Sequence, residues 1–343
     1  MPKELTHFTV SDLALERIER DFPESGRLLR NNYEHFMLGS IIPDTAYYHM
    51  PFLDKGEKVS FLSDKIHTKG GCLESAFLRR VMEMAMTGDD KAFAFSCGIV
   101  SHHLADAAFH PFVVYHTGSF TDPLVARRKS AQARHRFLEG LIDLKIVSEQ
   151  SRQVATVSRR MAGLLKKMPS PRLCLSLFIE AVLPQEGEEC IKSLTKHLET
   201  ARFFQLRLLG LYGRAYFKAL ILLVNRLSGC RYDHYAGLLY ADRSYLALKL
   251  LNERVEFKGP FTGEGLKQSL SSLLDETADQ VAGALSRYGE WRDRREKCPP
   301  DFFTAILPGP GGGAAGGRPE PWEAIFDVSE MEEALKRFTG RKG

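Results

Sequence analysis

The stretch SHHLADAAFHP, residues 101–111, places three histidines and one aspartate within eleven positions. On an α-helix, residues four positions apart lie on nearly the same face, so His102, Asp106 and His110 would form one polar stripe. His103 belongs to a different face, about 100° away. Imidazole and carboxylate groups together suit zinc and similar ions, and hydrolytic sites combine several such ligands around an open position. The stretch therefore indicates a candidate metal site.

The histidines are concentrated in the N-terminal part of the chain, since nine of the eleven lie within the first 135 residues. The spacing His-x-x-x-Asp/Glu occurs twice, as His102 with Asp106 and as His135 with Glu139. Chance alone predicts about one or two such pairs in this composition, and a salt-bridged pair on a helix surface is the alternative interpretation of each. The order and context of several motifs carry more information than either pair.

Five motifs occur in a fixed order along the chain: MPKELTH (1–7), LGSIIPD (38–44), SDKIH (63–67), SHHLADAAFHP (101–111) and HRFLEGLID (135–143). Together they resemble the zinc-dependent phospholipase C family over roughly residues 1–145. The resemblance implies an all-α fold, a multi-helix bundle with a cluster of three zinc ions. It also implies a relationship to the single-strand nucleases that bind three zinc ions.

The resemblance also implies which residues bind the metal. One zinc ion would be bound by Asp44, His67, His102 and a bridging Asp106, and a second by His110, His135 and Glu139. The third would be bound by His7, Asp106, and the α-amine and carbonyl of Pro2 after removal of Met1. Secreted family members begin with a tryptophan that ligates zinc, and this chain has none there. His116 is an alternative to His110, and a frayed start is the alternative for residues 1–3.

Such a cluster is suited to hydrolysis of a phosphate ester. A carboxylate shared by two cations offsets their repulsion, and several divalent ions can hold a phosphodiester while lowering the pKa of a bound water. We therefore expect a phospholipase C-like phosphodiesterase that acts on a phospholipid or related phosphodiester with a metal-bound hydroxide. Asp44 is the expected general base or nucleophile-orienting group. Asp64 and Asp143 are candidates for orienting the imidazoles, with surface charge as the alternative.

Two other functions remain open at this stage. A nuclease or nucleotidase on the same cluster would use exposed aromatic residues to stack bases, for which Tyr47, Tyr48 and Phe52 are candidates, although such a trio is more often part of a core. A non-catalytic binding module with the same fold is the third interpretation.

Helical periodicity dominates the whole chain, and there is no convincing run of alternating strands. The predicted helices are 10–21, 26–38, 73–87, 90–109, 123–147, 150–167, 170–182, 187–203, 204–227, 240–252 and 264–290. Pro111 should kink or end the helix at His110. A helical domain over 1–306 would be followed by a Gly/Pro linker at 307–321 and a short helical tail at 322–343, with a capping box at Ser329 and Glu332 and a stop at Gly340.

The composition limits the classes of interaction partner that we expect. The 47 basic and 43 acidic residues are too evenly balanced to indicate a dedicated nucleic-acid surface. The opening residues lack an unbroken apolar run, so we expect a cytoplasmic protein. The most apolar segment, 206–227, is interrupted by four basic residues, which predicts a buried amphipathic helix, with contact to a membrane surface as the alternative. The basic run 126–136 is either a solvated helix face or a surface that attracts an anionic head group.

Overall fold

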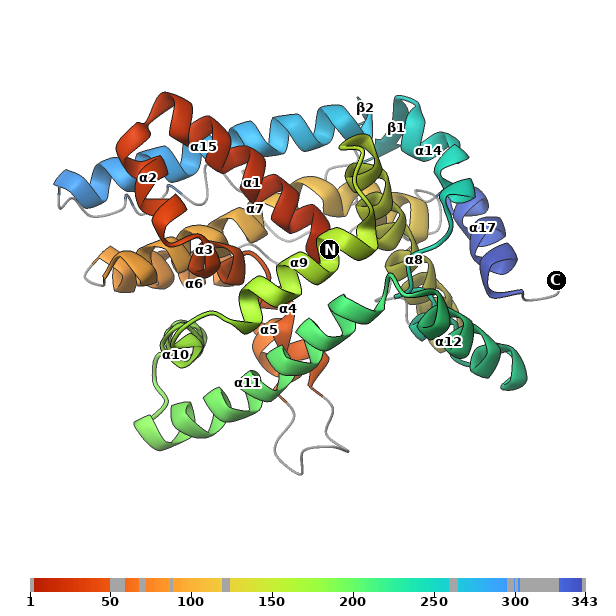
Figure 1. Cartoon of the computed structure of the whole chain (residues 1–343), viewed down its shortest axis with the longest axis horizontal. Coiled ribbons are helices and arrows are strands. Elements are labelled where there is room, and N and C mark those ends of the chain that lie inside the picture. The colour runs from red at the N-terminus through yellow and green to blue at the C-terminus, as the bar shows by residue number, and fades with distance from the viewer. Residues whose placement is uncertain are drawn as a thin grey trace.

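The computed structural model describes residues 3–49, 59–67, 72–86, 89–118, 124–258, 265–294, 299, 302 and 327–340, with only the backbone described at 72–75. These residues form a helical assembly, which confirms the all-α prediction (Figure 1). The N-terminal half contains α1 (Glu4–Asp21), α2 (Pro23–Asn31), α3 (Tyr33–Gly39), α4 (Ile42–Thr45), η1 (Ala46–Tyr48), α5 (Ser60–Ile66), α6 (Cys72–Met86), α7 (Asp90–Thr117) and α8 (Val125–Glu149). The C-terminal half contains α9 (Val154–Lys166), α10 (Pro171–Val182), α11 (Glu188–Leu211), α12 (Ala215–Leu227), α13 (Asp233–Ala236), η2 (Arg243–Ala247), α14 (Lys249–Asn252), β1 (Val255–Lys258), β2 (Gly265–Gln268), α15 (Leu270–Arg294) and α17 (Ser329–Thr339).

Helix α7 is the central element of the fold, and α1, α3, α6, α8 and α15 all pack against it. It continues through Pro111 to Thr117, so the stop predicted at His110 is wrong. Proline lacks one helical hydrogen-bond donor. The neighbouring side chains of Phe109, Phe112 and Val113 are almost completely buried, and their packing offsets that loss.

Two glycines allow α3 and α7 to approach each other closely. A Cβ atom on Gly39 would lie 2.0 Å from the carbonyl oxygen of Phe95, and one on Gly98 would lie 2.1 Å from that of Phe36. Only glycine at both positions permits this separation, because the obstructing atoms belong to the backbone. The short helix α4, which follows α3, is thereby held beside α7.

Helix α1 begins at Glu4, six residues earlier than predicted, and therefore contains His7. Its first turn is capped by a residue distant in sequence. The Asp143 carboxylate on α8 accepts hydrogen bonds from the backbone N–H groups of Leu5 at 3.2 Å and Thr6 at 2.7 Å. It also accepts from the Thr6 hydroxyl at 2.6 Å and from the Tyr240 hydroxyl at 2.8 Å. Asp143 thus satisfies donors that helix N-termini leave without partners.

Several predicted element boundaries are corrected by the structure. The helix expected over 26–38 is divided into α2 and α3, and the one expected over 240–252 is replaced by the short η2 and α14. A two-stranded antiparallel hairpin pairs Val255 with Gln268 through Lys258 with Gly265, although no strand was predicted. Asp44, expected in a loop, lies in the one-turn helix α4.

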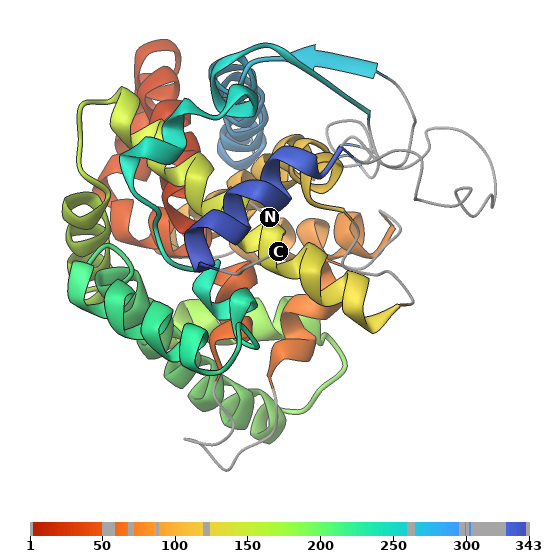
Figure 2. The same cartoon turned by 90° about the vertical axis from the view of Figure 1, so that its right-hand side faces the viewer.

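The C-terminal helix α17 docks on the body of the protein (Figure 2). It buries Met331 and Phe338, and the Phe338 ring stacks on Phe137 of α8 with 4.9 Å between centroids. Gly340 ends the helix in the left-handed conformation, with φ of 72°, as predicted. The predicted capping box is wrong, because α17 has Val328 at its N-cap and the Ser329 hydroxyl bonds to Asp327 instead. The linker prediction at 307–321 lies outside the described residues.

The segment 206–227 is not one buried helix. It is divided between α11, which ends at Leu211, and α12, which begins at Ala215. Among the described residues no single helix has both the length and the apolar character needed to cross a membrane, whereas α11 and α12 pass that test as a pair bent by 103°. Only Asn225 is buried in α12, so the prediction of a buried amphipathic helix is wrong for this part of the segment.

Candidate metal centre

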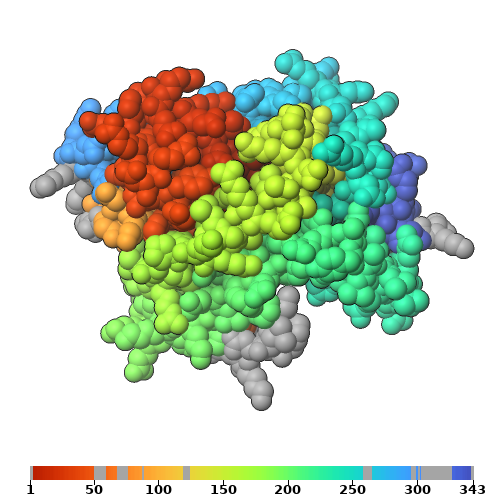
Figure 3. Space-filling model, in the orientation of Figure 1, coloured from red at the N-terminus to blue at the C-terminus, as the bar shows by residue number. Residues whose placement is uncertain are grey.

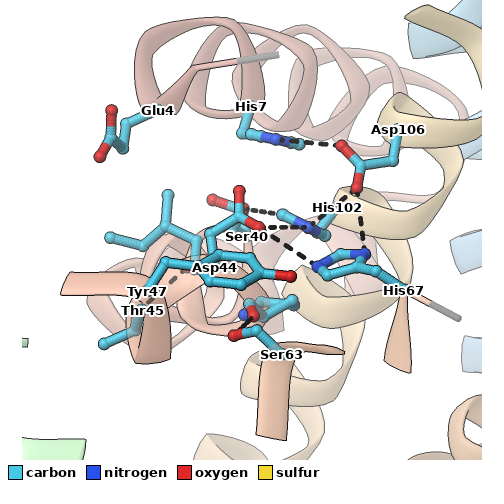
Figure 4. A network of polar contacts seen from close by, with 12 residues as sticks. Glu4, His7, Ser40, Asp44, Thr45, Tyr47, Ser63, His67, His102 and Asp106 are labelled. Carbon is cyan, nitrogen blue, oxygen red and sulfur yellow. Dashed lines mark hydrogen bonds and ion pairs between the residues drawn. The ribbon is translucent and has the colours of Figure 1, made fainter. Parts of the chain in front are cut away.

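Five predicted ligands come together in one cluster (Figure 4). They are His7 on α1, Asp44 on α4, His67 at the end of α5, and His102 and Asp106 on α7. Oδ2 of Asp106 lies 3.3 Å from Nε2 of His102 and 3.6 Å from Nδ1 of His67. Oδ1 of Asp106 lies 3.5 Å from Nε2 of His7. The two carboxylate oxygens therefore face different imidazoles, which is the arrangement that a bridging carboxylate requires.

Asp44 closes this group on the side opposite Asp106. Its Oδ1 lies 3.2 Å from Nε2 of His67 and 4.0 Å from Nε2 of His102. The ring of His7 stacks on that of His102 with 4.1 Å between centroids and 15° between planes. Two sets of potential ligand atoms lie within 4.8 Å of one another. One set comes from His7, Asp44 and His102, and the other comes from His67, His102 and Asp106.

The geometry and the polar contacts of this group fit a metal ion. Two ligands of one tetrahedral zinc ion are separated by about 3.4 Å when each lies about 2.1 Å from the metal. The observed separations of 3.2–4.0 Å span that value. Nε2 of His102 and both carboxylate oxygens of Asp106 are buried and make no hydrogen bond within the described part of the chain. Because buried polar atoms without hydrogen bonds are costly, a bound cation is the natural partner for them.

The orientation of His102 is fixed from the side opposite the other ligands. Its Nδ1 lies 2.9 Å from the Ser40 carbonyl oxygen and donates to it, so Nε2 is directed at Asp106. Burial disfavours the charged imidazole, but Asp106 and Asp44 outweigh this effect and raise the pKa of His102 to about 9. Burial lowers the pKa of His7 to about 3, and the nearby His102 adds to this effect. Asp106 and Asp44 therefore favour a positive charge beside His102.

A second group lies one helical turn further along α7. The ring of His110 lies 5.7 Å from that of His135 on α8, and Nε2 of His135 lies 3.0 Å from Oε1 of Glu139. Burial raises the pKa of Glu139, but nearby positive charges, His135 among them, lower it to about 2. The structure thus brings these three residues together beside Asp106, and their assignment to a second ion stays a prediction.

His116, the alternative to His110, lies in different surroundings. Its ring packs against the rings of Phe112 and Tyr115, at centroid distances of 4.9 Å and 5.0 Å. Burial lowers its pKa to about 4, with the Asp327 carboxylate and backbone opposing this effect. The contact between the His110 and His135 rings favours His110 as the ligand.

Pro2, the predicted ligand of the third ion, lies outside the described residues, so its role stays a prediction. The next residue, Lys3, is buried, with its ammonium 4.0 Å from the Tyr212 ring centroid and 4.2 Å from that of Tyr240. The Lys3 ammonium also donates to the Leu238 carbonyl oxygen. Lys3 and the cap provided by Asp143 hold the first turn of α1, so that His7 faces Asp106.

The structure changes the roles expected for the two additional aspartates. Asp143 contacts the backbone of α1 rather than an imidazole, and it positions His7 through the helix. Asp64 accepts from the Tyr47 hydroxyl at 3.1 Å. Sequence reasoning missed the Ser40 carbonyl, because a backbone acceptor has no signature in residue type. The Gly39 and Gly98 pair was the available signal, since glycine within helical segments often marks a close approach.

Comparison with known proteins identifies the family. The family model described as zinc dependent phospholipase C matches residues 6–198, which is more than half of the 343 residues. The chain belongs to the zinc dependent phospholipase C family. The match extends beyond the motif-bearing region and includes α9, α10 and the first half of α11. Comparison with curated proteins and with solved structures gives no significant match.

Proposed function

We propose that this family member is a zinc-dependent phosphodiester hydrolase of the phospholipase C type. The observation that carries the proposal is the Asp106 carboxylate, whose two oxygens face His7 on one side and His67 with His102 on the other. When bound there, zinc would act as a Lewis acid towards a phosphoryl oxygen and would lower the pKa of a water molecule.

The residues around the site would have different roles. Ser40 fixes the tautomer of His102, and Asp106 links the α1 ligand to those on α5 and α7. The Asp44 side chain retains 17% exposure, compared with 9% for Asp106, so Asp44 is better placed to contact substrate. We assign Asp44 the orientation of the attacking water and acceptance of its proton.

The nuclease alternative draws less support from the structure. The Tyr48 hydroxyl is turned inward and donates to Glu4, and Phe52 lies outside the described residues. Tyr47 is 44% exposed, and its ring lies 6.3 Å from that of His67. One aromatic ring at the edge of the site is also compatible with packing against a lipid head group.

The test combines metal analysis with substrate profiling. Protein purified without chelator should contain more than one zinc ion per chain and should hydrolyse a soluble phosphatidylcholine analogue and bis-p-nitrophenyl phosphate. Asp44→Asn should lose activity, whereas the neighbouring Asp64→Asn should retain it. Less than one zinc per chain would contradict both enzymatic interpretations. Rapid cleavage of single-stranded DNA with inert lipid would favour the nuclease instead.

A further inference from the structure

Helix α12 displays an apolar face to solvent. Its exposed fractions are 61% for Tyr216, 55% for Leu220, 54% for Leu223, 47% for Val224 and 80% for Leu227. These positions follow the spacing of one helix face, so the row is continuous. Single exposed apolar residues are ordinary, but a row of five on one helix marks an interaction surface. The helix lies at the edge of the molecule, at the lower right of Figures 1 and 3.

The charges that flank this row along the chain have one sign. Residues 200–232 contain six basic residues and no acidic residue. Arg214 directly precedes α12 and Arg231 follows it by four residues, and both are exposed. The first acidic residue after this stretch, Asp233, is buried and accepts from Asn225. Asp242 pairs with Lys218, so this one ammonium is already balanced. An acidic surface would therefore complement the row.

The basic character continues onto a neighbouring helix. α13 packs against both α12 and α8, and residues 124–138 of α8 and its N-cap contain five basic residues and no acidic residue. The Arg136 guanidinium on α8 donates to the His234 carbonyl oxygen on α13 at 3.0 Å, so the two segments are in contact. Tyr232 and Tyr235, exposed by 45% and 53%, lie between them in the fold. Tyrosine is favoured where apolar and aqueous surroundings meet.

We propose that α12, with the flanking α13 and the start of α8, docks on an anionic lipid surface. An interfacial helix inserts its apolar face at the level of the head groups while basic residues contact anionic lipids. Self-association is a poorer match. A two-fold contact through this face would place the basic flanks of two copies against each other. The proposal goes beyond the proposed hydrolase activity and does not require the metal centre to be active.

The test is sedimentation of the full-length protein with vesicles of phosphatidylcholine alone or mixed with phosphatidylglycerol. We expect binding to the mixed vesicles that weakens as salt is added. Leu220→Gln/Leu223→Gln/Leu227→Gln should weaken this binding by about tenfold or more, because each leucine loses its burial in the lipid. The control Leu173→Gln, at a position on α10 that is 51% exposed, should bind as the wild type does.

A charge variant tests the electrostatic component of the proposed lipid binding. Arg214→Ala/Arg231→Ala should weaken binding to the mixed vesicles by roughly tenfold and should reduce its dependence on salt. Circular dichroism checks the fold of each variant, and the single change Leu227→Gln replaces the triple variant if that one misfolds. A smaller loss in the single variant would still support the proposal.

Several outcomes would overturn it. One is absence of wild-type binding to any vesicle, and another is equal binding by the triple variant and the control. A dimer that dissociates in the triple variant, while vesicle binding is unaffected, would assign the face to a second copy. Hydrolysis of a soluble phosphodiester is measured on the same samples and should be unchanged in all these variants. If the wild type binds vesicles but hydrolyses nothing, the proposed function fails and the docking surface stands.

Discussion

Helices α7 and α12 are both strongly apolar, yet they occupy opposite environments. α7 is buried along most of its length and carries His102 and Asp106 in the interior, whereas α12 buries only Asn225. α7 is surrounded by α1, α3, α6, α8 and α15, while α12 packs mainly on α13 and α17. Apolar composition therefore does not decide burial in this protein. The number of neighbouring elements decides it, and polar residues are buried where those neighbours supply partners.

The largest expected effect is that of Asp106→Ala. Because this carboxylate faces predicted ligands on both of its sides, its removal should disturb two ions. It should also lower phosphodiesterase activity by at least about 100-fold, the upper range for loss of a residue that only supports a metal ligand. Glu139→Ala should remove one ion and leave the helical content unchanged. Zinc per chain, measured by atomic spectroscopy, checks both. Equal metal loss in the two variants would contradict the division of ligands.

The next largest effect is expected from a substitution where α3 and α7 approach each other closely. In Gly98→Ala the new Cβ would lie 2.1 Å from the Phe36 carbonyl oxygen and 2.8 Å from the Cα of Gly39. Separation of the helices should cost about 3 kcal/mol of unfolding free energy and should withdraw the Ser40 carbonyl from His102. Gly283→Ala on α15 is the control, because nothing lies within 4 Å of its Cβ, and it should stabilise the protein by about 0.5–1 kcal/mol. Denaturant unfolding measures both changes.

Removal of the α1 cap should have a somewhat smaller effect. Asp143→Ala leaves the N–H groups of Leu5 and Thr6 without acceptors in a buried location, at a cost of about 2–3 kcal/mol. Because His7 then loses its fixed position, zinc content should also fall. Tyr240→Phe removes only one donor to Asp143 and should cost about 1 kcal/mol or less. Full zinc content in a folded Asp143→Ala protein would mean that metal binding does not depend on this cap.

A pH experiment distinguishes His116 from His110, the predicted ligand. Burial lowers the pKa of His116 from 6.5 in the unfolded chain to about 4 in the folded protein. The unfolded state therefore binds the proton more tightly between these values, and stability decreases as pH falls through 6.5 towards 4. From pH 7 to pH 5 this loss amounts to about 2 kcal/mol. His116→Gln should reduce the loss by that amount and keep its zinc, whereas His110→Ala should lose one ion.

The smallest effect is expected on α12. Leu223→Ala should change the unfolding free energy by no more than about 0.5 kcal/mol, because the side chain is 54% exposed and alanine favours a helix. Leu104→Ala on α7, where the side chain is 2% exposed, should cost about 2–5 kcal/mol. Thermal unfolding at several protein concentrations compares them. A large, concentration-dependent loss for Leu223→Ala would mean that α12 is buried in an assembly and that the contrast with α7 is wrong.

Features that depend on local backbone geometry could be predicted from the residues alone. Helical spacing placed His102, Asp106 and His110 on one stripe of α7, and His135 above Glu139 on α8. It also predicted an all-α fold and the glycine stop at Gly340. These inferences succeeded because the period of a helix and the conformational freedom of glycine do not depend on distant residues.

Other features depend on contacts between residues that are far apart along the chain. Asp143 caps a helix that begins 139 residues earlier, which carries His7 into α1. The packing around α7 overrides the helix-breaking tendency of Pro111, and the scarcity of neighbours leaves the apolar face of α12 exposed. The hairpin of β1 and β2 likewise depends on pairing between two four-residue strands. Burial, capping from another helix and close approach are properties of neighbours in space, and no local pattern in a chain specifies which neighbours these will be.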